Sequence, residues 1–422
     1  MHIVIVGAGL AGVTAAWYLR EAGHRVTVVE RRQAAALEAS YANGAQISIS
    51  HPEPWANPGA PGVILRWLGR SDAPLRFRFP AEPARWRWGL EFLAQCLPAR
   101  TRRNTRAIAE LAAYSGSMLQ ALRAQTGIRY DHLERGILHL YFGAADLRHG
   151  QQQCEILHKL GIGARMLTPD QCVGEEPALA HLAPTLSGAM WGTDDESGDA
   201  FRFTQALADI AQQAGVEFLF GQRVGRIEMA HGRISALHVH DDAGRRGALS
   251  GDAFVMAAGV HSQLLARAVR EQLSIYPVKG YSATLPIVDA RRAPTVSLTD
   301  ESRRIVCSRL GNHLRVAGMA DLQGYNYQLD EVRCALLTQW VEENIPGSAD
   351  TQRAVFWTGL RPATPNNLPV IGRSRRATNL FYNTGHGTLG WTLACGSAKA
   401  LADIIDGRSP APDFPFLRGS IH

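Results

Sequence analysis

The fold is decided by residues 2–30, which read HIVIVGAGLAGVTAAWYLREAGHRVTVVE. The β-branched run that opens this stretch predicts a buried strand, residues 15–22 predict a helix, and the closing RVTVVE predicts a second buried strand. Between the first strand and the helix stand Gly7, Gly9 and Gly12 in the spacing GxGxxG. A strand, a glycine-rich turn, a helix and a strand that ends in an acid together form a dinucleotide-binding unit of Rossmann type.

Each residue type in this unit has a physical reason. Gly7 permits the tight turn, Gly9 lets the backbone approach a pyrophosphate, and Gly12 lets the helix pack close to the strand. The amino terminus of the helix presents free N–H groups and the positive end of its dipole to the phosphates. Glu30, which ends the second strand, can accept a hydrogen bond from a ribose hydroxyl and would repel a 2′-phosphate. The unit therefore favours FAD or NAD, without choosing between them.

A second glycine turn near the carboxyl terminus favours FAD. Residues 379–407 read NLFYNTGHGTLGWTLACGSAKALADIIDG, which predicts a strand, a turn at Gly385 and Gly387, and a long helix. A helix amino terminus placed by a strand can hold the pyrimidine edge of an isoalloxazine, where negative charge develops on reduction. The alternative interpretation is an ordinary connection between a strand and a helix.

The composition predicts a soluble protein with a large core. The chain has 422 residues, of which 46% are hydrophobic and 19% charged, and its length suggests two or three domains. The apolar run near the amino terminus is interrupted by three glycines and follows no basic segment, so it does not predict a signal or membrane segment. Six scattered cysteines, without a CxxC pair or a histidine cluster at metal-ligand spacing, predict buried thiols, a reducing compartment and no metal. We expect a cytoplasmic protein, or one attached peripherally to the cytoplasmic face of the inner membrane.

The formal charge of +6 comes from one basic segment. Residues 55–106 carry ten arginines, no lysine and three acids, which leaves the rest of the chain at −1, and they hold four of the nine tryptophans. This mixture is typical of a nucleic-acid groove, of a membrane-surface patch, or of a packed helical region whose arginine stems cover apolar surface. We expect no nucleic acid as a partner, because the remainder of the chain is near neutral. Peripheral membrane contact through residues 64–106 is a hypothesis that rests on Trp67, Trp86 and Trp88 with Arg66, Arg70, Arg76, Arg78, Arg85 and Arg87.

Four further motifs carry a resemblance to a known family. They are SYANGAQIS at 40–48, PVKGYSATLP at 277–286, GLRPATPNNLPVIG at 359–372 and GHGTLGWTLACGSAKALADII at 385–405. In this order they resemble the FAD-dependent D-amino-acid dehydrogenases, which belong to the superfamily of glycine oxidase and D-amino-acid oxidase. The resemblance implies noncovalent FAD and hydride transfer from the Cα–N bond of a D-amino acid. The imino acid so formed hydrolyses to a 2-oxo acid and ammonia, and the electrons pass to a quinone or another acceptor.

The resemblance also implies which residues hold FAD. They are Gly7, Ala8, Gly9, Leu10, Ala11, Gly12, Glu30 and Arg31 in the first unit, Ala42, Asn43, Gly44, Gln46 and Ile47 along the flavin and the ribityl chain, Val224 at the adenine, Ala257, Ala258 and Gly259 on the second pyrophosphate side, and Gly385, His386, Gly387, Thr388, Leu389 and Gly390 over the pyrimidine edge. We expect His386 to contact the flavin through its backbone.

Two residues are the candidates for the reaction itself. A bidentate grip on the substrate carboxylate suits arginine, because its fork matches two oxygens. Arg361 in GLRP matches the carboxylate-binding arginine of the family. Tyr281 is a second candidate, as a pocket lid or carboxylate partner, and its alternative is a core aromatic on a strand.

The second polar clamp of the pocket is left open. Some relatives place an arginine in the glycine-rich turn where this chain has Thr388, and a tyrosine in the strand where it has Val306 or Cys307. The side chains that remain as candidates are His51, Tyr325 and Tyr327.

The expected fold class is α/β, or α+β overall, with a Rossmann-like FAD-binding domain and a second, mainly antiparallel-sheet substrate domain. We expect residues 1–75, 155–265 and 351–422 to form the first and residues 76–154 and 266–350 to form the second. The runs at 136–142 and 304–318 predict strands of the substrate domain, the latter as a hairpin.

Three alternative functions follow from the same residues. One is an FAD oxidase or dehydrogenase of glycine, sarcosine or a cyclic imino acid such as D-proline or hydroxyproline. Another is a basic nucleic-acid or membrane-binding protein with a structural flavin, which would leave Arg361 without a role. A nicotinamide dehydrogenase would leave the carboxyl-terminal glycine turn without a purpose.

Overall fold

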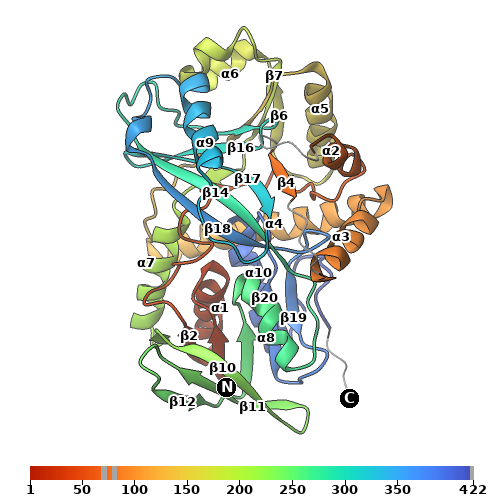
Figure 1. The fold of residues 1–422 in the computed structure, drawn as a ribbon, viewed down its shortest axis with the longest axis vertical. Helices are drawn as coiled ribbons and strands as arrows, with labels where there is room; N and C mark the ends of the chain where they lie inside the picture. Colours follow the sequence, from red (N-terminus) through yellow and green to blue (C-terminus); the bar gives the residue numbers. More distant parts are fainter. Residues whose placement is uncertain (68–73, 78–82, 419–422) are drawn as a thin grey trace.

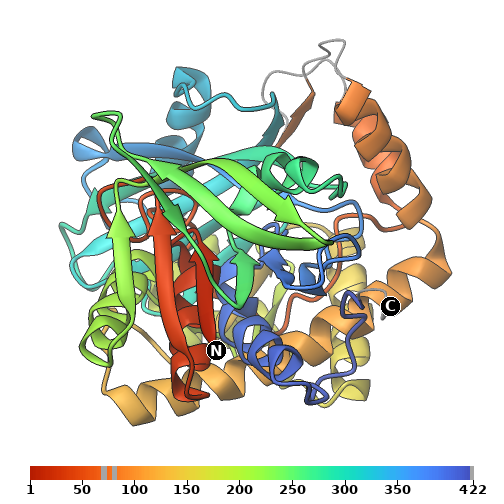
Figure 2. The same ribbon diagram turned by 90° about the horizontal axis from the view of Figure 1, so that it is seen from below.

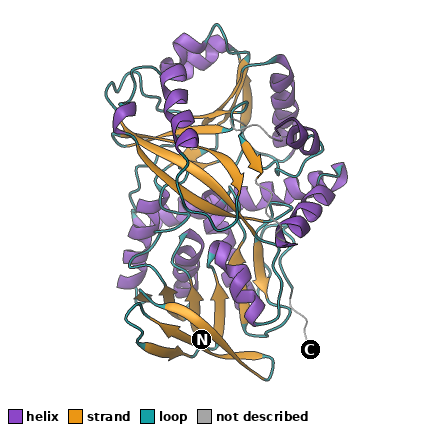
Figure 3. Ribbon diagram, viewed as in Figure 1, coloured by secondary structure: helices purple, strands orange, loops and turns teal. Residues whose placement is uncertain are grey.

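The computed structural model describes residues 1–67, 74–77 and 83–418. Figures 1 and 3 show a six-stranded sheet in the half that holds the amino terminus and a nine-stranded sheet in the other half. The α-helices of these ranges are α1 (Leu10–Glu21), α2 (Ala60–Trp67), α3 (Pro83–Gln95), α4 (Pro98–Thr126), α5 (Ala144–Lys159), α6 (Pro169–Glu175), α7 (Ala200–Gln213), α8 (Ser262–Ala268), α9 (Glu331–Asn344) and α10 (Gly390–Ile405). Short 3-10 turns lie at η1 (Pro177–Leu182), η2 (Gly259–His261) and η3 (Thr351–Arg353).

The six-stranded sheet is parallel apart from one edge strand. Its order is β19 (Val370–Arg373), β20 (Leu380–Thr384), β13 (Ala253–Met256), β1 (His2–Val6), β2 (Arg25–Glu30) and β9 (Glu217–Phe220), with only β19 antiparallel to its neighbour. Ile3 and Ile5 pack with α1, α7 and α10 on one face, whereas Val4 and Val6 pack on the other. From Ile3 to Val6 the opening strand is apolar because both of its faces are covered there.

A three-stranded antiparallel sheet covers the second face. It consists of β10 (Arg223–Ala230), β11 (Arg233–His240) and β12 (Arg246–Leu249), drawn in green in Figure 2 beside the parallel sheet. Ile227, Ile234 and Leu237 bring its apolar side against Val4 and Val6. Alternation along β11 follows from this arrangement, since its other face meets water.

The nine-stranded sheet is mainly antiparallel. Its order is β18 (Val355–Ala363), β14 (Tyr276–Pro286), β17 (His313–Leu322), β16 (Ile305–Leu310), β15 (Ser297–Asp300), β5 (Ile137–Tyr141), β7 (Gly188–Gly192) and β6 (Ala164–Leu167), and β4 (Leu75–Phe77) pairs with β17. Only β15 with β5 and β17 with β4 are parallel. A two-stranded ladder of β3 (Gln46–Ile47) and β8 (Glu196–Ser197) lies apart from it.

The predicted fold class is confirmed by these two sheets. The strand at 136–142 and the hairpin at 304–318 are present as β5 and as β16 with β17. The first helix begins at Leu10, whereas sequence reasoning started it at Ala15. The helix starts earlier because Gly9 already serves as its N-cap, so the turn is shorter than the glycine spacing suggested.

Two groups of strands and one helix lie with the other half of the molecule than the predicted domain segments suggest. β6 and β7 fall in the segment 155–265 assigned to the FAD-binding domain, yet they belong to the nine-stranded sheet. The same holds for β18, which falls in the segment 351–422 assigned to that domain. Conversely, α4 from the segment 76–154 packs against α10, where Gly396 donates its N–H to the Ser115 hydroxyl at 3.0 Å. Each of these contacts joins segments that are far apart in the chain, so the order of the elements in the sequence does not predict it.

Part of the basic segment is packed inward. Arg85 is buried and donates to the Tyr276 hydroxyl at 2.9 Å, and the indole of Trp88 donates to the Ala363 carbonyl at 2.9 Å. Arg76 bonds to Asp321 at 2.6 Å. These three side chains are therefore bonded within the protein and do not support the membrane hypothesis. Its members Arg70 and Arg78 lie outside the described residues.

The α-helices within the described ranges are 7 to 29 residues long. None of them is both long enough and apolar enough to cross a membrane.

Candidate active site

One large cavity runs between the two sheets, with a volume of about 810 Å³. Its wall holds most of the residues expected at the cofactor: Gly7, Gly9, Leu10, Ala11, Glu30, Arg31, Ala42, Asn43, Gly44, Gln46, Val224, Ala257, Ala258, Gly259, His386, Gly387, Thr388, Leu389 and Gly390. The expected residues Ala8, Gly12, Ile47 and Gly385 lie behind this wall. Both candidates for the reaction, Arg361 and Tyr281, have atoms on it.

The first glycine turn is sterically closed to larger residues. A Cβ on Gly12 would lie 1.8 Å from the Gly7 carbonyl oxygen, and a Cβ on Gly7, whose φ is +107°, would lie 2.7 Å from the Ala257 carbonyl oxygen. Gly9 is different, since a Cβ there would meet only the Ser40 hydroxyl at 3.4 Å. Gly12 therefore serves helix packing, while Gly9 leaves backbone open to the cavity.

Glu30 is buried at the end of β2 and is held by the turn. Its Oε2 accepts the Ala8 N–H at 2.7 Å and its Oε1 accepts the Arg32 N–H at 2.8 Å. Arg31 bonds to Glu38 at 2.6 Å and meets His261 at 3.3 Å. The carboxylate is thus held in one position on the cavity wall.

The loop that carries Ala42, Asn43 and Gly44 is tied to the nine-stranded sheet by its carbonyl oxygens. Ser282 donates to the Ala42 carbonyl at 2.6 Å, and Arg315 donates to the Asn43 carbonyl at 3.2 Å. A Cβ on Gly44 would lie 2.7 Å from Val306. These hydrogen bonds to its carbonyl oxygens hold the loop in place on the cavity wall.

The second glycine turn is joined directly to the strand that bears Arg361. His386 forms a β-bridge with Ala363, and the Gly387 N–H donates to the Pro362 carbonyl at 3.0 Å. The His386 ring is buried with Nε2 3.1 Å from the Ser397 hydroxyl, and burial lowers its pKa to about 4. Its imidazole is therefore neutral at physiological pH.

Arg361 lies in a trough made by glycine. Its guanidinium packs over Gly280, where a Cβ would stand 2.5 Å from Cζ, and it donates to the Met319 carbonyl at 2.7 Å. Within the described ranges no carboxylate comes within ion-pair distance of Arg361. Burial lowers the pKa of the guanidinium to about 10, which leaves it charged. A half-buried guanidinium that faces a cavity without a direct carboxylate partner is suited to bind the carboxylate of a ligand.

Tyr281 points away from this trough. Neighbouring residues of a strand face opposite sides of a sheet, so Tyr281 lies on the other face of β14 from Gly280. Its ring is 1% exposed, its hydroxyl donates to Asp321 at 3.0 Å, and burial raises the pKa of the phenol. The structure places it among the core residues, which is the alternative that the sequence left open.

The candidates for the second clamp separate in the structure. His51 and Tyr327 line the cavity, as do Thr388 and Val306. Tyr325 bonds instead to the Val260 carbonyl at 2.9 Å.

Sequence reasoning missed the indole of Trp357. It lies over Gly359, where a Cβ would stand 2.0 Å from the ring, and it lines the cavity. The sequence alone offered no signal for this contact, because the pairing of Gly280 with Gly359 across β14 and β18 depends on strand register.

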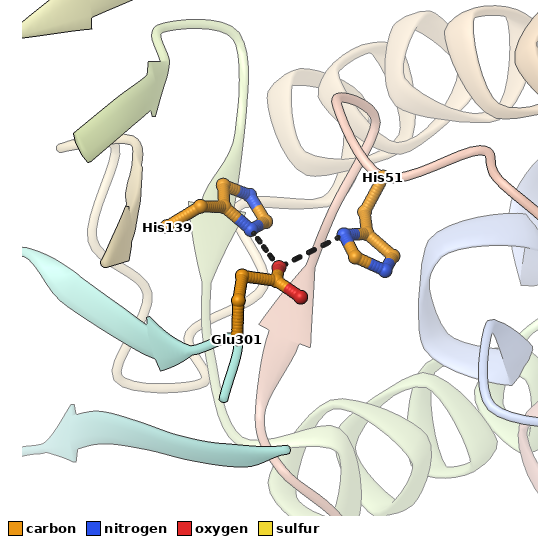
Figure 4. A group of neighbouring side chains, drawn as sticks. All are labelled: His51, His139 and Glu301. Carbon is orange, nitrogen blue, oxygen red and sulfur yellow. Dashed lines mark hydrogen bonds and ion pairs between the residues drawn. The ribbon is translucent and has the colours of Figure 1, made fainter. Parts of the chain in front are cut away.

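Sequence reasoning also missed a cluster of three polar side chains on the cavity wall. His139 Nδ1 lies 2.9 Å from Glu301 Oε1, and His51 Nδ1 lies 3.5 Å from the same oxygen (Figure 4). Burial opposes charge on His139, but hydrogen bonds to Asp195 and Glu301 outweigh it and raise its pKa to about 9. Burial lowers the pKa of His51, and the neighbouring imidazoles and Arg304 lower that of Glu301.

The cavity fits FAD by its composition and by its glycine turns. A family model described as "FAD dependent oxidoreductase" (DAO) matches residues 2–404. The chain belongs to this family. The DAO assignment accounts for the Rossmann-type unit, the second glycine turn and the cavity between two sheets, and it makes the protein an FAD-dependent oxidoreductase.

Curated relatives of this DAO-family protein are similar along nearly the whole chain. The D-amino acid dehydrogenase of Dechloromonas aromatica is 49% identical over 418 residues, which cover 99% of this chain and 100% of the relative. The D-amino acid dehydrogenase of Paramagnetospirillum magneticum is 44% identical and covers 97% of this chain and 96% of its own length.

Solved structures of other DAO-fold enzymes share the architecture. Glycine oxidase from Geobacillus kaustophilus superposes with a TM-score of 0.75 at 21% identity and covers 100% of this chain and 99% of its own. L-proline dehydrogenase from P. horikoshii gives a TM-score of 0.72 at 16% identity, with 98% of this chain and 95% of its own covered. At these identities the likeness establishes the fold.

Proposed function

We propose that this protein oxidises the Cα–N bond of a D-amino acid by hydride transfer to FAD and passes the electrons to a quinone or a similar acceptor. The observation that carries the proposal is Arg361, a half-buried guanidinium that has no carboxylate within ion-pair distance in the described residues and is joined through Ala363 to the turn at His386. Relatives named D-amino acid dehydrogenase at 42–49% identity support the same substrate class.

The residues that would hold FAD are the cavity-lining members of the set expected from the sequence. The turn at Gly9 would meet the pyrophosphate, Glu30 the ribose, and the turn at Gly387 the pyrimidine edge of the flavin. Bound there, FAD supplies the electron sink for the reaction. Noncovalent attachment of this FAD is part of the proposal, and release of the flavin by acid tests it.

The protein would contribute orientation and electrostatics. Two parallel N–H groups of Arg361 would bind the substrate carboxylate and fix the direction of the Cα–H bond. Its anchor on the Met319 carbonyl uses Nη1 and leaves the rest of the fork for the ligand. The imino acid product would then leave and hydrolyse to a 2-oxo acid and ammonia.

A peripheral membrane surface would suit a quinone acceptor. On α3 the exposed side chains Trp86, Leu90 and Leu93 follow one another at spacings of four and three residues, which places them on one face of the helix. Figures 1 and 2 place α3 at the periphery of the molecule. Exposed arginines follow at the start of α4: Arg100, Arg102, Arg103 and Arg106. An apolar helix face flanked by basic residues is typical of interfacial binding.

Anaerobic titration of the flavin band tests the reaction. D-Amino acids should bleach the flavin of the purified holoprotein and L-amino acids should not. A quinone should then restore the colour faster than air does. Bleaching by glycine, sarcosine or D-proline in preference to other D-amino acids would instead support the oxidase alternative, and no bleaching by any amino acid would refute the proposal. Acid precipitation should release the flavin into the supernatant if it is held noncovalently.

A further inference from the structure

We propose that His51, His139 and Glu301 form a binding site for one divalent transition-metal ion, of the Zn²⁺ class, on the wall of the cavity. The inference rests on the arrangement of these side chains and does not depend on the proposed reaction. Their potential ligand atoms lie within 4.8 Å of one another.

The three ligands are brought together from distant parts of the chain. His139 lies on β5 and pairs with Thr299 on β15, and Glu301 follows two residues later with its N–H on the Leu140 carbonyl at 3.3 Å. His51 comes from the loop after β3 and meets the same carboxylate from the other side (Figure 4). The position of the group is therefore set by sheet register rather than by local sequence.

The distances match a metal coordination shell. Glu301 Oε1 stands 2.9 Å from His139 Nδ1 and 3.5 Å from His51 Nδ1. Zinc binds imidazole nitrogen and carboxylate oxygen at about 2.0–2.2 Å, so two ligands of one ion stand about 3.0–3.5 Å apart. Both separations fall close to this range. His51 is the adjustable member, because its side chain is 34% exposed and stands on an irregular loop.

An outer shell already orients the buried histidine. His139 is 1% exposed, and its Nε2 faces the Ser50 hydroxyl at 3.3 Å and Asp195 Oδ2 at 4.0 Å. The Ser50 N–H in turn donates to Asp195 Oδ1 at 2.8 Å. A carboxylate behind the second ring nitrogen is the usual outer partner of a metal-bound histidine, since it keeps the proton on that nitrogen and directs the other one at the ion.

The charges around the group favour a cation. Asp195 is buried, and within the described residues it forms no ion pair with lysine or arginine. Arg304 bonds to the second oxygen of Glu301 and leaves Oε1 toward the histidines. Asp195 and Glu301 face the His139 ring from its two nitrogens, so a dication bound at Nδ1 would replace the proton held there and lie between the ring and the Glu301 carboxylate.

The site has an open side. His51, His139 and Glu301 all line the cavity, so a fourth position would face solvent and ligand. Two imidazoles and one carboxylate with an open position form a ligand set that suits zinc and other late divalent ions. The fourth ligand would be water or a carboxylate that enters the cavity.

Metal binding to the FAD-loaded protein tests the proposal. After removal of metal by a chelator and dialysis, ZnCl2 is titrated calorimetrically into the wild type and into His51→Ala, and CoCl2 is added in a parallel sample to follow its visible spectrum. We expect one ion per chain, a Co²⁺ spectrum of low coordination number, and an affinity at least about 100-fold weaker in His51→Ala. The control is His149→Ala, which removes a cavity-lining histidine outside the trio and should keep the wild-type affinity.

The flavin spectrum reports whether each variant is folded. Glu301→Gln, which keeps shape and removes charge, should lose affinity as His51→Ala does, so a folding defect in one variant does not decide the result. Absence of binding in the wild type would overturn the proposal, and so would weak binding that is equal in all four proteins.

Discussion

The guanidinium of Arg361 packs directly over the α-carbon of Gly280, so closely that a Cβ there would stand 2.5 Å from Cζ. The two residues lie on neighbouring strands, with Gly280 opposite Gly359 and Arg361 two positions further along β18. Glycine on β14 is thus what lets the arginine lie flat against the sheet and face the cavity.

Gly280→Ala should displace that guanidinium without removing it. Because a small misplacement of a positioning group costs up to about 100-fold in rate, we expect kcat/KM for a D-amino acid to fall by roughly 10- to 100-fold. Steady-state kinetics with a dye acceptor measure the change. Gly174→Ala, on an exposed turn of α6 with nothing within 4 Å of the added Cβ, should keep wild-type kinetics. Equal kinetics in the two variants would contradict the assigned contact.

Arg361→Ala should remove the carboxylate grip itself. The loss of a charged hydrogen-bonded partner predicts a decrease of about 2–5 kcal/mol in substrate binding. Arg361→Lys should recover only part of it, since an ammonium lacks the planar fork. Titration of flavin bleaching in both variants measures the change, with exposed Arg353→Ala as the control. Unchanged kcat/KM in Arg361→Ala would remove this residue from the site.

The two glycines of the first turn should respond differently to alanine. Gly12→Ala places a Cβ 1.8 Å from a backbone oxygen, so we expect a large fall in Tm even without FAD. Gly9→Ala meets only a side-chain hydroxyl at 3.4 Å, so the apoprotein should keep its Tm while FAD binding weakens. Thermal melts with and without FAD separate the two effects. Identical melts for both variants would show that Gly12 does not serve helix packing.

The buried imidazole of His386 should make the fold sensitive to acid. Its pKa is lowered to about 4 by burial, so in the unfolded chain it takes up a proton near pH 6.5 that the folded chain refuses. Its contribution to the unfolding free energy should decrease by roughly 3 kcal/mol as the pH falls from 6.5 to 4 and stay level below that. Urea unfolding at several pH values should show a flatter profile in His386→Gln. Ser397→Ala, which keeps the imidazole, should retain the steep one.

The exposed face of α3 should determine any attachment to vesicles. Replacing Leu90 and Leu93 by serine removes two apolar side chains, each worth about 1.5–3 kcal/mol when fully buried. We expect at least a tenfold loss of binding to anionic vesicles at low salt, measured by co-sedimentation. Val288→Ser, an exposed apolar residue elsewhere, is the control. If the wild type ignores such vesicles, α3 is a peripheral helix without a membrane role.

Local patterns were readable from the sequence, and register was not. The glycine turn at Gly7 and the strand of Arg361 depend on residues next to one another, so their geometry could be predicted. The side of β14 that Tyr281 faces depends on how two distant strands align. The meeting of His51, His139 and Glu301 depends on three segments that the chain order keeps far apart. The sequence left open whether Arg85 and Trp88 face a membrane or pack inward, because their buried partners come much later in the chain.

The bridge between Ala363 and His386 has a consequence for how ligands enter. It couples the strand of the substrate arginine to the turn beside the expected flavin, and the Gly387 N–H reinforces it. A movement of one sheet relative to the other would therefore carry the strand of Arg361 and the turn at His386 together. Exchange of substrate and product would then depend on another part of the cavity wall, formed by the loop that carries His51 and by the helix α2 that follows it.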